Sequence, residues 1–493
     1  MDTFLLGNAS GENFTKALAA SFLVCGAALV LGYRKRSPKP PLPPGPPGWP
    51  LVGNAFDVPA EEFWLKYKEW SDLYGSDVIY LNIMGSPVIV LNSLEACKTL
   101  LETRASNYSS RPEMPMMNDL VGFGWNIGFI PYDEKWKESY RGHCRLFAGS
   151  FILDVAYGLD IQSKDDFYIQ LAERGMRAMA LAGTFSGYLV NFIPSLKYLP
   201  WWFPGVQFKR DARVWRRDAE AMPRDCLRFA EDALKRGDAR PCFATQLLQE
   251  LEQENGEFAE KMKVIHDVLG SIYSGKYYMC GSRFTVVSSF TTFLLTMVQN
   301  PDVLKRAQKD IDEAVSQLGR LPDFREYRAL PYIQALVWEV LRWRPVAPVA
   351  VPHFATEDDV YNGYCIPAGS TVFANSWAVL HDETVYGPNP DLFDPSRFMN
   401  ASNDDINPEI SMGYDMFGFG RRICPARLVA VESLWIFVVS VLAVFDIKAA
   451  DGEENIGKYT SGMLIHPHPF RMQILPRSID AANLIRNGVI ASL

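Results

Sequence analysis

The chain has 493 residues, which allows one large domain or about three of average size, with a hydrophobic core that needs no disulfide staples. Its 49 basic and 57 acidic residues give a formal net charge of −8, so the positive footprint of a general nucleic-acid-binding protein is missing. We therefore expect no nucleic acid as a partner. Hydrophobic residues make up 48% of the chain, which is typical of a globular protein, and its 30 Phe, 21 Tyr and 12 Trp could line large apolar pockets.

The first element in chain order is an apolar stretch at residues 17–33 that contains no charged residue. As a helix it would be about 26 Å long, close to the minimum that crosses a bilayer. Basic residues follow it directly, whereas only Lys16 precedes it, so the positive-inside rule keeps the following residues cytoplasmic. A cleaved signal peptide would carry its basic residues before the apolar stretch. We therefore expect an uncleaved transmembrane anchor at residues 17–33.

Two short segments of different character flank the anchor. The lumenal tail, residues 1–16, holds sequons at Asn8 and Asn13, which are candidate glycosylation sites. Residues 34–49 form a basic and proline-rich hinge, whose seven prolines favour a stiff, extended spacer. No linker or repeat divides residues 50–493, and we predict that they form one domain.

Within this domain, four stretches have clear secondary-structure patterns. Residues 77–91 contain two β-rich runs around a Gly-Ser-Pro turn and predict a hairpin. Residues 302–318 predict an amphipathic helix, and residues 331–343 predict another, which Pro345 terminates. Residues 434–445 are apolar nearly all round but too few to span a membrane. They predict a buried core helix.

Many common catalytic signatures are absent from the chain. Its eight cysteines include no C-x-x-C pair and no Cys/His cluster at zinc spacing, so we expect a reduced, cytosol-facing domain. The motifs H-E-x-x-H, G-x-S-x-G, G-x-x-x-x-G-K and G-x-G-x-x-G are missing as well. The chain is therefore predicted to bind no dinucleotide by a Rossmann unit of its own.

One dense segment near the C-terminus, residues 417–427 (FGFGRRICPAR), runs directly into a helical pattern. Its two glycines permit a tight loop with bare N–H groups, Pro425 suits a first helical position, and three arginines surround Cys424. We expect all three features to stabilise a thiolate at Cys424. Such a thiolate suits haem-iron ligation, and it would also suit a nucleophile or a redox sensor. No His is a convincing base beside it, which favours haem ligation.

The pattern Phe417-x-x-Gly420-x-x-x-Cys424-x-Ala426 resembles the haem-binding loop of the cytochrome P-450 superfamily. The resemblance implies that Cys424 is the axial ligand of the haem iron and that Arg422 pairs with a haem propionate. Phe417 and Gly420 belong to the same cofactor-binding loop. The family usually has Gly where this chain has Ala426, which places an extra methyl group close to the porphyrin.

Two further motifs agree with this resemblance. Glu339 and Arg342 are similar to the family's E-x-x-R, and Arg397 to the arginine of its P-x-R-F, which together make a Glu–Arg–Arg network. Helical periodicity alone predicts an exposed i, i+3 pair for Glu339 and Arg342, because they lie opposite the apolar stripe. The resemblance implies a structural network instead.

The resemblance weakens in the helix that passes over the haem. Thr285 aligns with the catalytic Thr that helps deliver protons, but Phe284 replaces the acid before it. Residues 276–282 look like an insertion. The acid of the family's proton relay therefore has no counterpart at this position.

A second departure from the family pattern concerns the residues that would contact the haem propionates. Trp136 and Arg141 correspond to the family's W-x-x-x-R with Arg141 one position late, and residues 141–152 look shortened by several tens of residues. His353 either lies near a propionate or is a structural histidine. A wrongly assembled reading frame would explain both departures.

Together these features predict a mainly α-helical cytochrome P-450 fold with a small β-rich region, preceded by one N-terminal transmembrane helix. Residues 50–493 would be the catalytic domain, on the cytosolic face of the endoplasmic reticulum membrane. The cofactor implied is haem b, with NADPH electrons supplied through NADPH-cytochrome P-450 reductase. The chain looks most similar to fungal membrane-bound members of secondary metabolism.

The reaction implied is monooxygenation, in which one atom of O₂ enters an apolar small molecule. Terpenoid, polyketide, fatty acid and indole substrates all stay open. A haem-thiolate isomerase or dehydratase is the alternative that needs no proton relay. A non-catalytic remnant is the alternative that the apparent deletion near 141–152 and insertion near 276–282 favour.

Overall fold

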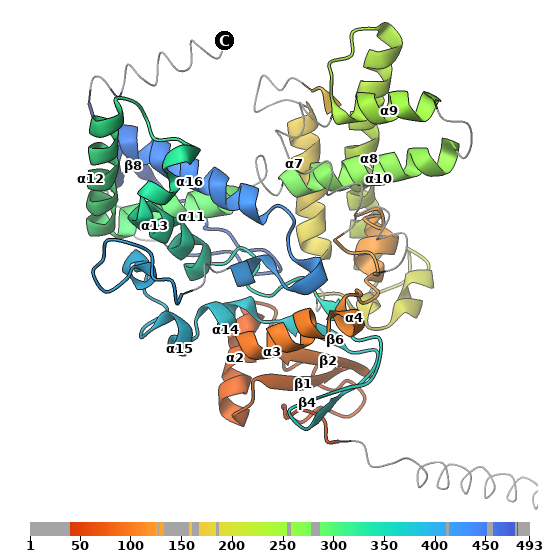
Figure 1. Cartoon of the computed structure of the whole chain (residues 1–493). Helices are drawn as coiled ribbons and strands as arrows, with labels where there is room; N and C mark the ends of the chain where they lie inside the picture. Colours follow the sequence, from red (N-terminus) through yellow and green to blue (C-terminus); the bar gives the residue numbers. More distant parts are fainter. Residues whose placement is uncertain are drawn as a thin grey trace, which may run out of the picture.

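The computed structural model describes residues 40–126, 128–132, 157–159, 167–183, 187–253, 258–277, 286–410, 414–450, 457–478 and 481. Two groups of helices stand side by side above a small sheet (Figure 1). The fold is mainly helical, as predicted. The predicted anchor at residues 17–33 and the sequons at Asn8 and Asn13 lie outside the described residues.

The predicted hairpin is confirmed as strands β1 (Val78–Ile83) and β2 (Ser86–Leu91), which pair antiparallel. Met84 and Gly85 form the two-residue turn, both with positive φ (53° and 89°). Such a turn follows the right-handed twist of the strands. In β1, buried and half-buried residues alternate after the first residue. The last four residues of β2 are all buried, because the sheet continues beyond this strand.

Strand β6 (Thr371–Ala374) extends this sheet by pairing parallel to β2, and β3 (His353–Phe354) completes the order β1-β2-β6-β3. The sheet therefore joins segments far apart in the sequence. Two small antiparallel sheets accompany it: β4 (Asp359–Tyr361) with β5 (Tyr364–Ile366), and β7 (Phe445–Ala449) with β8 (Met472–Pro476).

The first helical group contains both predicted amphipathic helices. Residues 301–318 form α12 (Pro301–Leu318), whose first residue is the proline and whose end is capped by Gly319 at φ 69°. Its buried face, Leu304, Ala307, Gln308 and Ile311, has the expected helical spacing. The second predicted helix is α13 (Pro331–Trp343). The group is completed by α11 (Val286–Gln299) and α16 (Arg427–Val444).

The second group is formed by α7 (Phe167–Ala182), α8 (Gln207–Arg236), α9 (Phe243–Gln253) and α10 (Phe258–Tyr277). Its residues share a large hydrophobic cluster with α2 and the sheet. The remaining short elements are α2 (Phe63–Tyr74), α3 (Leu94–Cys97), α4 (Ala105–Tyr108), α14 (Ser376–Leu380), α15 (Glu383–Tyr386), and the π or 3-10 turns η1 (Lys98–Thr103), η2 (Met116–Val121), η4 (Leu189–Asn191), η5 (Pro194–Tyr198), η6 (Phe324–Ala329), η7 (Pro395–Phe398), η8 (Tyr414–Phe417) and η9 (Gly420–Arg422).

Helix α16 begins earlier than the predicted apolar core, directly after Ala426. Within the described part of the chain it alone is long and apolar enough to cross a membrane. Its buried residues nevertheless include Trp435, Val438 and Leu442, which belong to the same hydrophobic cluster as α12 and α13. Its packing is that of a core helix.

We predict that Trp435→Ala lowers the free energy of unfolding by about 3–5 kcal/mol, the usual cost of emptying a large buried site. Trp435 is fully buried and its ring lies 5.4 Å from that of Tyr327. Denaturant unfolding of the full chain measures the loss. The matched control is Leu428→Ala in the same helix, where the side chain is exposed and the expected change is within about 0.5 kcal/mol. Equal losses would contradict the core assignment.

Candidate functional site

The cysteine loop joins η8 and η9 to the start of α16. The Cys424 N–H donates to the Phe417 carbonyl at 2.8 Å, which closes the loop on itself. Gly418 and Gly420 have φ values of +87° and +57°, in the left-handed region that favours glycine. A Cβ at Gly420 would lie 2.1 Å from the Leu101 carbonyl oxygen in η1. Gly420 therefore serves the close packing of this loop on η1.

The Cys424 side chain is partly exposed at the N-terminal end of α16. Burial raises the pKa of its thiol, and the Ala426 N–H and the Arg427 charge lower it only in part. Of the features expected to stabilise the thiolate, a backbone N–H and the Arg427 charge act in that direction, but burial outweighs them. Arg421 and Arg422 lie near the Tyr132 ring, each 5.5 Å from its centre, rather than on the sulfur. A bound metal cation displaces a thiol proton directly, so a metal-ligand role does not require the protein to lower this pKa.

Ala426, where the resembling family has Gly, is buried as the N-cap of α16. Its φ of −86° and ψ of 4° are open to any residue. The backbone here does not require glycine.

Arg422 extends from the cysteine loop toward two distant segments. Its Nε donates to the Ser109 carbonyl and its Nη2 to the Ile130 carbonyl, both at 2.8 Å. The geometry fixes a cationic group beside the loop that carries Cys424.

A second arginine, Arg111, is buried close to Arg422. It donates to the carbonyls of Gly128, Val351 and Pro352 at 2.9–3.0 Å. Burial lowers its pKa well below the ordinary value, and the neighbouring Arg422 charge lowers it further. Within the described residues, no carboxylate forms an ion pair with Arg111.

His353 lies beside the two arginines, and we call the group Arg111, His353 and Arg422 the cation cluster after the two arginine charges. The Nδ1 of His353 lies 2.8 Å from the Tyr108 carbonyl. Burial lowers its pKa to about 3, with contributions from the charges of Arg111 and Arg422. Like charges gathered in a buried place are stable when an anion joins them. The propionates of a haem are such anions, so these residues and Cys424 fit the cofactor that the sequence implies.

Arg111 was missed as a site residue from sequence. It stands between Ser110 and Pro112, and this local sequence gives no sign of its chemistry. Two of its three carbonyl partners, Val351 and Pro352, lie more than 200 residues away.

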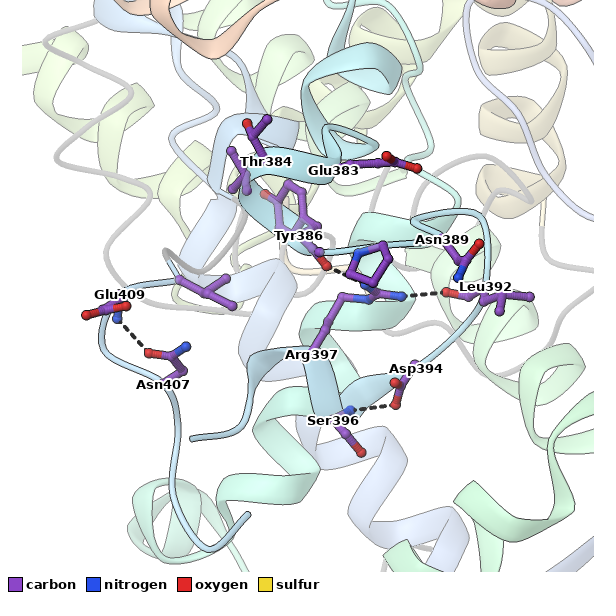
Figure 2. Close-up of a pocket in the computed structure, with 14 residues that line it drawn as sticks. Glu383, Thr384, Tyr386, Asn389, Leu392, Asp394, Ser396, Arg397, Asn407 and Glu409 are labelled. Atoms are coloured by element: carbon purple, nitrogen blue, oxygen red, sulfur yellow. Dashed lines mark hydrogen bonds between the residues drawn. The ribbon is translucent and has the colours of Figure 1, made fainter. Parts of the chain in front are cut away.

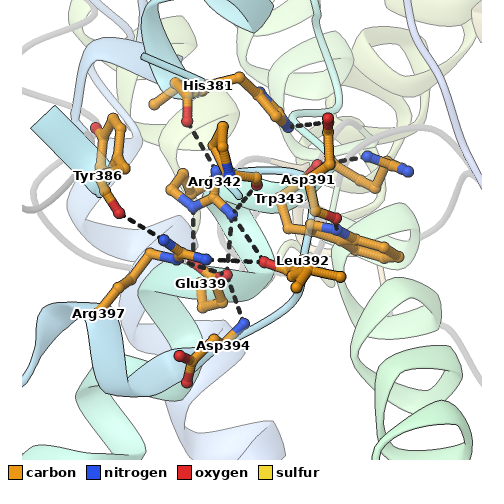
Figure 3. A network of polar contacts seen from close by, with 12 residues as sticks. Glu339, Arg342, Trp343, His381, Tyr386, Asp391, Leu392, Asp394 and Arg397 are labelled. Carbon is orange, nitrogen blue, oxygen red and sulfur yellow. Dashed lines mark hydrogen bonds and ion pairs between the residues drawn. The ribbon is translucent and has the colours of Figure 1, made fainter. Parts of the chain in front are cut away.

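The three network residues meet in the core, as Figure 3 shows. Arg342 binds Glu339 through two hydrogen bonds, Nε to Oε2 at 2.7 Å and Nη2 to Oε1 at 2.9 Å. Arg397 donates to the same Oε1 at 3.1 Å. Glu339 and Arg342 are fully buried, so the exposed pair that periodicity predicts is wrong. The reason is tertiary packing, because η7 and the chain before it cover this face of α13.

The remaining donors of the network hold the segment between α14 and η7. Arg342 and Arg397 donate to backbone carbonyls of Leu380, Tyr386, Pro390 and Leu392. The Asp394 N–H donates to Glu339 at 2.8 Å. One buried carboxylate and two guanidinium groups therefore fix the course of this irregular segment.

His381 lies at the edge of the network. Its ring stacks on Trp377 at 3.9 Å, and its Nδ1 lies 2.9 Å from the Trp377 carbonyl. Burial lowers its pKa to about 3, with the Arg342 charge as the next cause.

A hollow of about 830 Å³ opens beside the network, lined by side chains from Glu383 to Ile410 that include Arg397 (Figure 2). None of its lining residues comes from the cysteine loop or the cation cluster. This hollow is therefore separate from the candidate cofactor site.

Three predicted site residues, Trp136, Arg141 and Thr285, lie outside the described residues. The described flanks of Thr285 belong to two helices, α10, which ends at Tyr277, and α11, which begins at Val286. The resemblance would place this whole region on one long helix over the haem.

The comparisons with known proteins give matches over most of the chain. The family model for cytochrome P450 matches residues 43–143 and 143–474. A cytochrome P450 monooxygenase of Armillaria gallica is 37% identical, with 94% of this chain and 97% of that protein aligned. Cytochrome P450 monooxygenase 98 of Postia placenta is 35% identical (94% and 95%), and the tryptamine 4-monooxygenase of Psilocybe cyanescens is 34% identical (87% and 91%).

The chain therefore belongs to the cytochrome P450 family. Membership in this family makes it an oxidoreductase that works with haem and with electrons from a redox partner.

We predict that Glu339→Gln lowers the free energy of unfolding by about 3–5 kcal/mol, because it leaves two buried guanidinium groups facing a neutral amide. Denaturant unfolding of the haem-loaded full chain measures the change. Glu313→Gln is the control: its ion pair with Lys309 is 3.7 Å long and exposed, so little change is expected. Similar effects of both substitutions would argue against a structural role for the network.

The second prediction concerns pH. Because the pKa of His381 is about 3 in the folded chain and 6.5 ordinarily, the unfolded state binds more protons between these values, and stability falls as the pH falls through this window. From pH 7 to pH 5 the wild type should lose about 2 kcal/mol more unfolding free energy than His381→Gln. Exposed His468→Gln serves as the control. Parallel profiles of unfolding free energy against pH for wild type and His381→Gln would show that burial of His381 does not contribute to the pH dependence of stability.

Proposed function

We propose that the chain is a haem-thiolate monooxygenase that inserts one atom of O₂ into an apolar small molecule, in fungal secondary metabolism. The observation that carries the proposal is the pairing of the Cys424 loop with the buried cation cluster. Relatives named as monooxygenases support it. The family's haem, when bound, supplies the oxygen activation.

The chain's own residues would bind the haem and orient it for that chemistry. Cys424 would be the axial sulfur ligand, held by the N–H bond to the Phe417 carbonyl. Arg111 and Arg422 would hold the propionates; the carbonyl contacts that orient both side chains support this role. His353 would add a hydrogen bond in its neutral form, because its low pKa keeps it uncharged near neutral pH. Thr285 would assist proton delivery, and Trp136 and Arg141 would reach the propionate side.

Electrons would come from NADPH through NADPH-cytochrome P-450 reductase, and the haem would be haem b. The chain carries no G-x-G-x-x-G motif for a dinucleotide of its own. Exposed Lys98 and Arg421 near the cysteine loop offer cationic contacts to an acidic partner.

The proposed placement is the endoplasmic reticulum membrane, with residues 17–33 as a single anchor and residues 34–49 as the hinge. Residues 50–493 would be the cytosolic catalytic domain. The lumenal tail at residues 1–16 would carry any glycan at Asn8 or Asn13.

A second candidate, a chain without catalytic turnover, has two supporting observations. The family match divides into two segments that meet at residue 143, inside the region where the sequence looks shortened. The alignment with the Armillaria protein also spans 510 residues, more than the 493 of this chain, so part of that relative has no counterpart here.

We predict that Cys424→Ser abolishes the red-shifted absorption band that the reduced wild-type protein should give with carbon monoxide, and abolishes product formation with it. Absorption spectra and product analysis with a reductase present measure both. The control is Cys365→Ser, a free cysteine in β5 outside the site. Product formation by Cys424→Ser would contradict the proposal. A wild-type protein that binds no haem would establish the second candidate.

A further inference from the structure

The end of the short helix α4 carries two backbone carbonyls that hold members of the cation cluster. The Tyr108 carbonyl lies 2.8 Å from the Nδ1 of His353, and the Ser109 carbonyl accepts from the Nε of Arg422 at 2.8 Å. Because a carbonyl oxygen only accepts hydrogen bonds, the Nδ1 of His353 is the donor. The positions of His353 and Arg422 therefore depend on the course of the backbone at the end of α4.

A carboxylate from strand β4 binds both ends of α4. The Tyr108 hydroxyl donates to Asp359 Oδ2 at 2.9 Å, and the N-cap residue Arg104 donates to Asp359 Oδ1 at 2.8 Å. Tyr108 is fully buried, and burial, followed by the Asp359 charge, raises the pKa of its hydroxyl well above the ordinary value. The hydroxyl therefore stays protonated and donates to the carboxylate.

Other contacts place α4 along the edge strand β3 and the segment after it. Ser109 forms a β-bridge with Phe354, which belongs to β3. The Asn107 Oδ1 accepts from the Glu357 N–H at 2.7 Å, and the Asn107 carbonyl accepts from the Thr356 N–H at 3.1 Å. These bonds fix the segment lengthwise. The bond to Asp359 adds a restraint on the side chain of Tyr108, the residue whose own carbonyl holds His353.

Partners that do not touch a cofactor still set its environment when they orient the groups that do. We propose that Tyr108 and Asp359 are positioning residues for the haem. Their hydrogen bond fixes the carbonyls of Tyr108 and Ser109, and these carbonyls place His353 and Arg422 toward the haem propionates. This inference rests on the proposed function and extends it to two residues that act on the haem only through others.

The first variant is Tyr108→Phe, which removes one hydroxyl and keeps the buried ring. A hydrogen bond to a charged group is strong enough to change an equilibrium about tenfold. We therefore expect the haem to leave the variant about tenfold faster, measured as transfer to an excess of apomyoglobin. Asp359→Asn keeps the size of the side chain but loses its charge, so it should give a smaller change in the same direction. It also provides the test if Tyr108→Phe does not fold.

Resonance Raman spectra of the haem-loaded full chain separate positioning from general stability. The bending bands of the propionates report the hydrogen bonds that their carboxylates accept, and they should shift in Tyr108→Phe. The iron–sulfur stretching band, which reports the bond to Cys424, should stay in place. The matched control is Tyr361→Phe in the same strand as Asp359. It removes another tyrosine–aspartate bond, from the Tyr361 hydroxyl to Asp77 Oδ2 at 3.2 Å, and should change neither the bands nor the rate of haem loss.

Three results would overturn the inference. One is a Tyr108→Phe variant with a lower free energy of unfolding but unchanged propionate bands and haem loss, which would make the bond a purely structural contact. Another is an equal effect of Tyr361→Phe. The third is a shift of the iron–sulfur band together with the propionate bands, which would indicate a general disturbance of the site. A wild-type chain that takes up no haem would contradict the proposed function and this inference with it, whereas unaffected variants of a haem-loaded chain contradict the inference alone.

Discussion

The Glu339 carboxylate organises the part of the molecule that precedes the cysteine loop. It accepts hydrogen bonds from Arg342 of its own helix, from Arg397 of η7 and from the Asp394 N–H. Because the site is buried, each of these donors compensates a desolvation cost that would otherwise oppose folding. The N–H groups of Arg342 that do not bind Glu339 alone also donate to backbone carbonyls, in a segment with little regular structure. The network thus replaces the hydrogen-bond ladder that a helix or strand would have supplied there.

In the cation cluster, by contrast, the contacts described for the arginines are to backbone carbonyls and not to a carboxylate. Glu339 balances the charges around it, whereas Arg111 and Arg422 are held by neutral carbonyls and His353 is kept neutral by burial. Carbonyl contacts orient a guanidinium group without cancelling its charge. Arg111, which has no carboxylate partner among the described residues, therefore keeps its charge available for an anion supplied from outside the polypeptide. Burial likewise raises the pKa of the Cys424 thiol, so a metal ion bound there would have to displace the thiol proton.

Local patterns predicted the local parts of the fold. The hairpin at residues 77–91 and the helix at residues 331–343 depend on turn residues, prolines and periodicity that lie within each segment. The same periodicity placed Glu339 and Arg342 at the surface, because it contains no information on the chain that packs over that face from residues 380–398. Arg111 was missed for the same reason. The family resemblance predicts roles for Cys424 and Arg422, but the direction in which Arg421 and Arg422 point is set by distant segments.

The parallel pairing of β2 with β6 has a consequence for synthesis. A contact between Asn92 and Asn375, which flank these strands, closes a loop of 283 residues. Such long-range closure is slow, and the strand that completes it leaves the ribosome only after about three quarters of the chain. Until then β1 and β2 form a two-stranded ribbon with an apolar open edge, which is prone to aggregation. Nascent chains should therefore depend on chaperones for most of their translation.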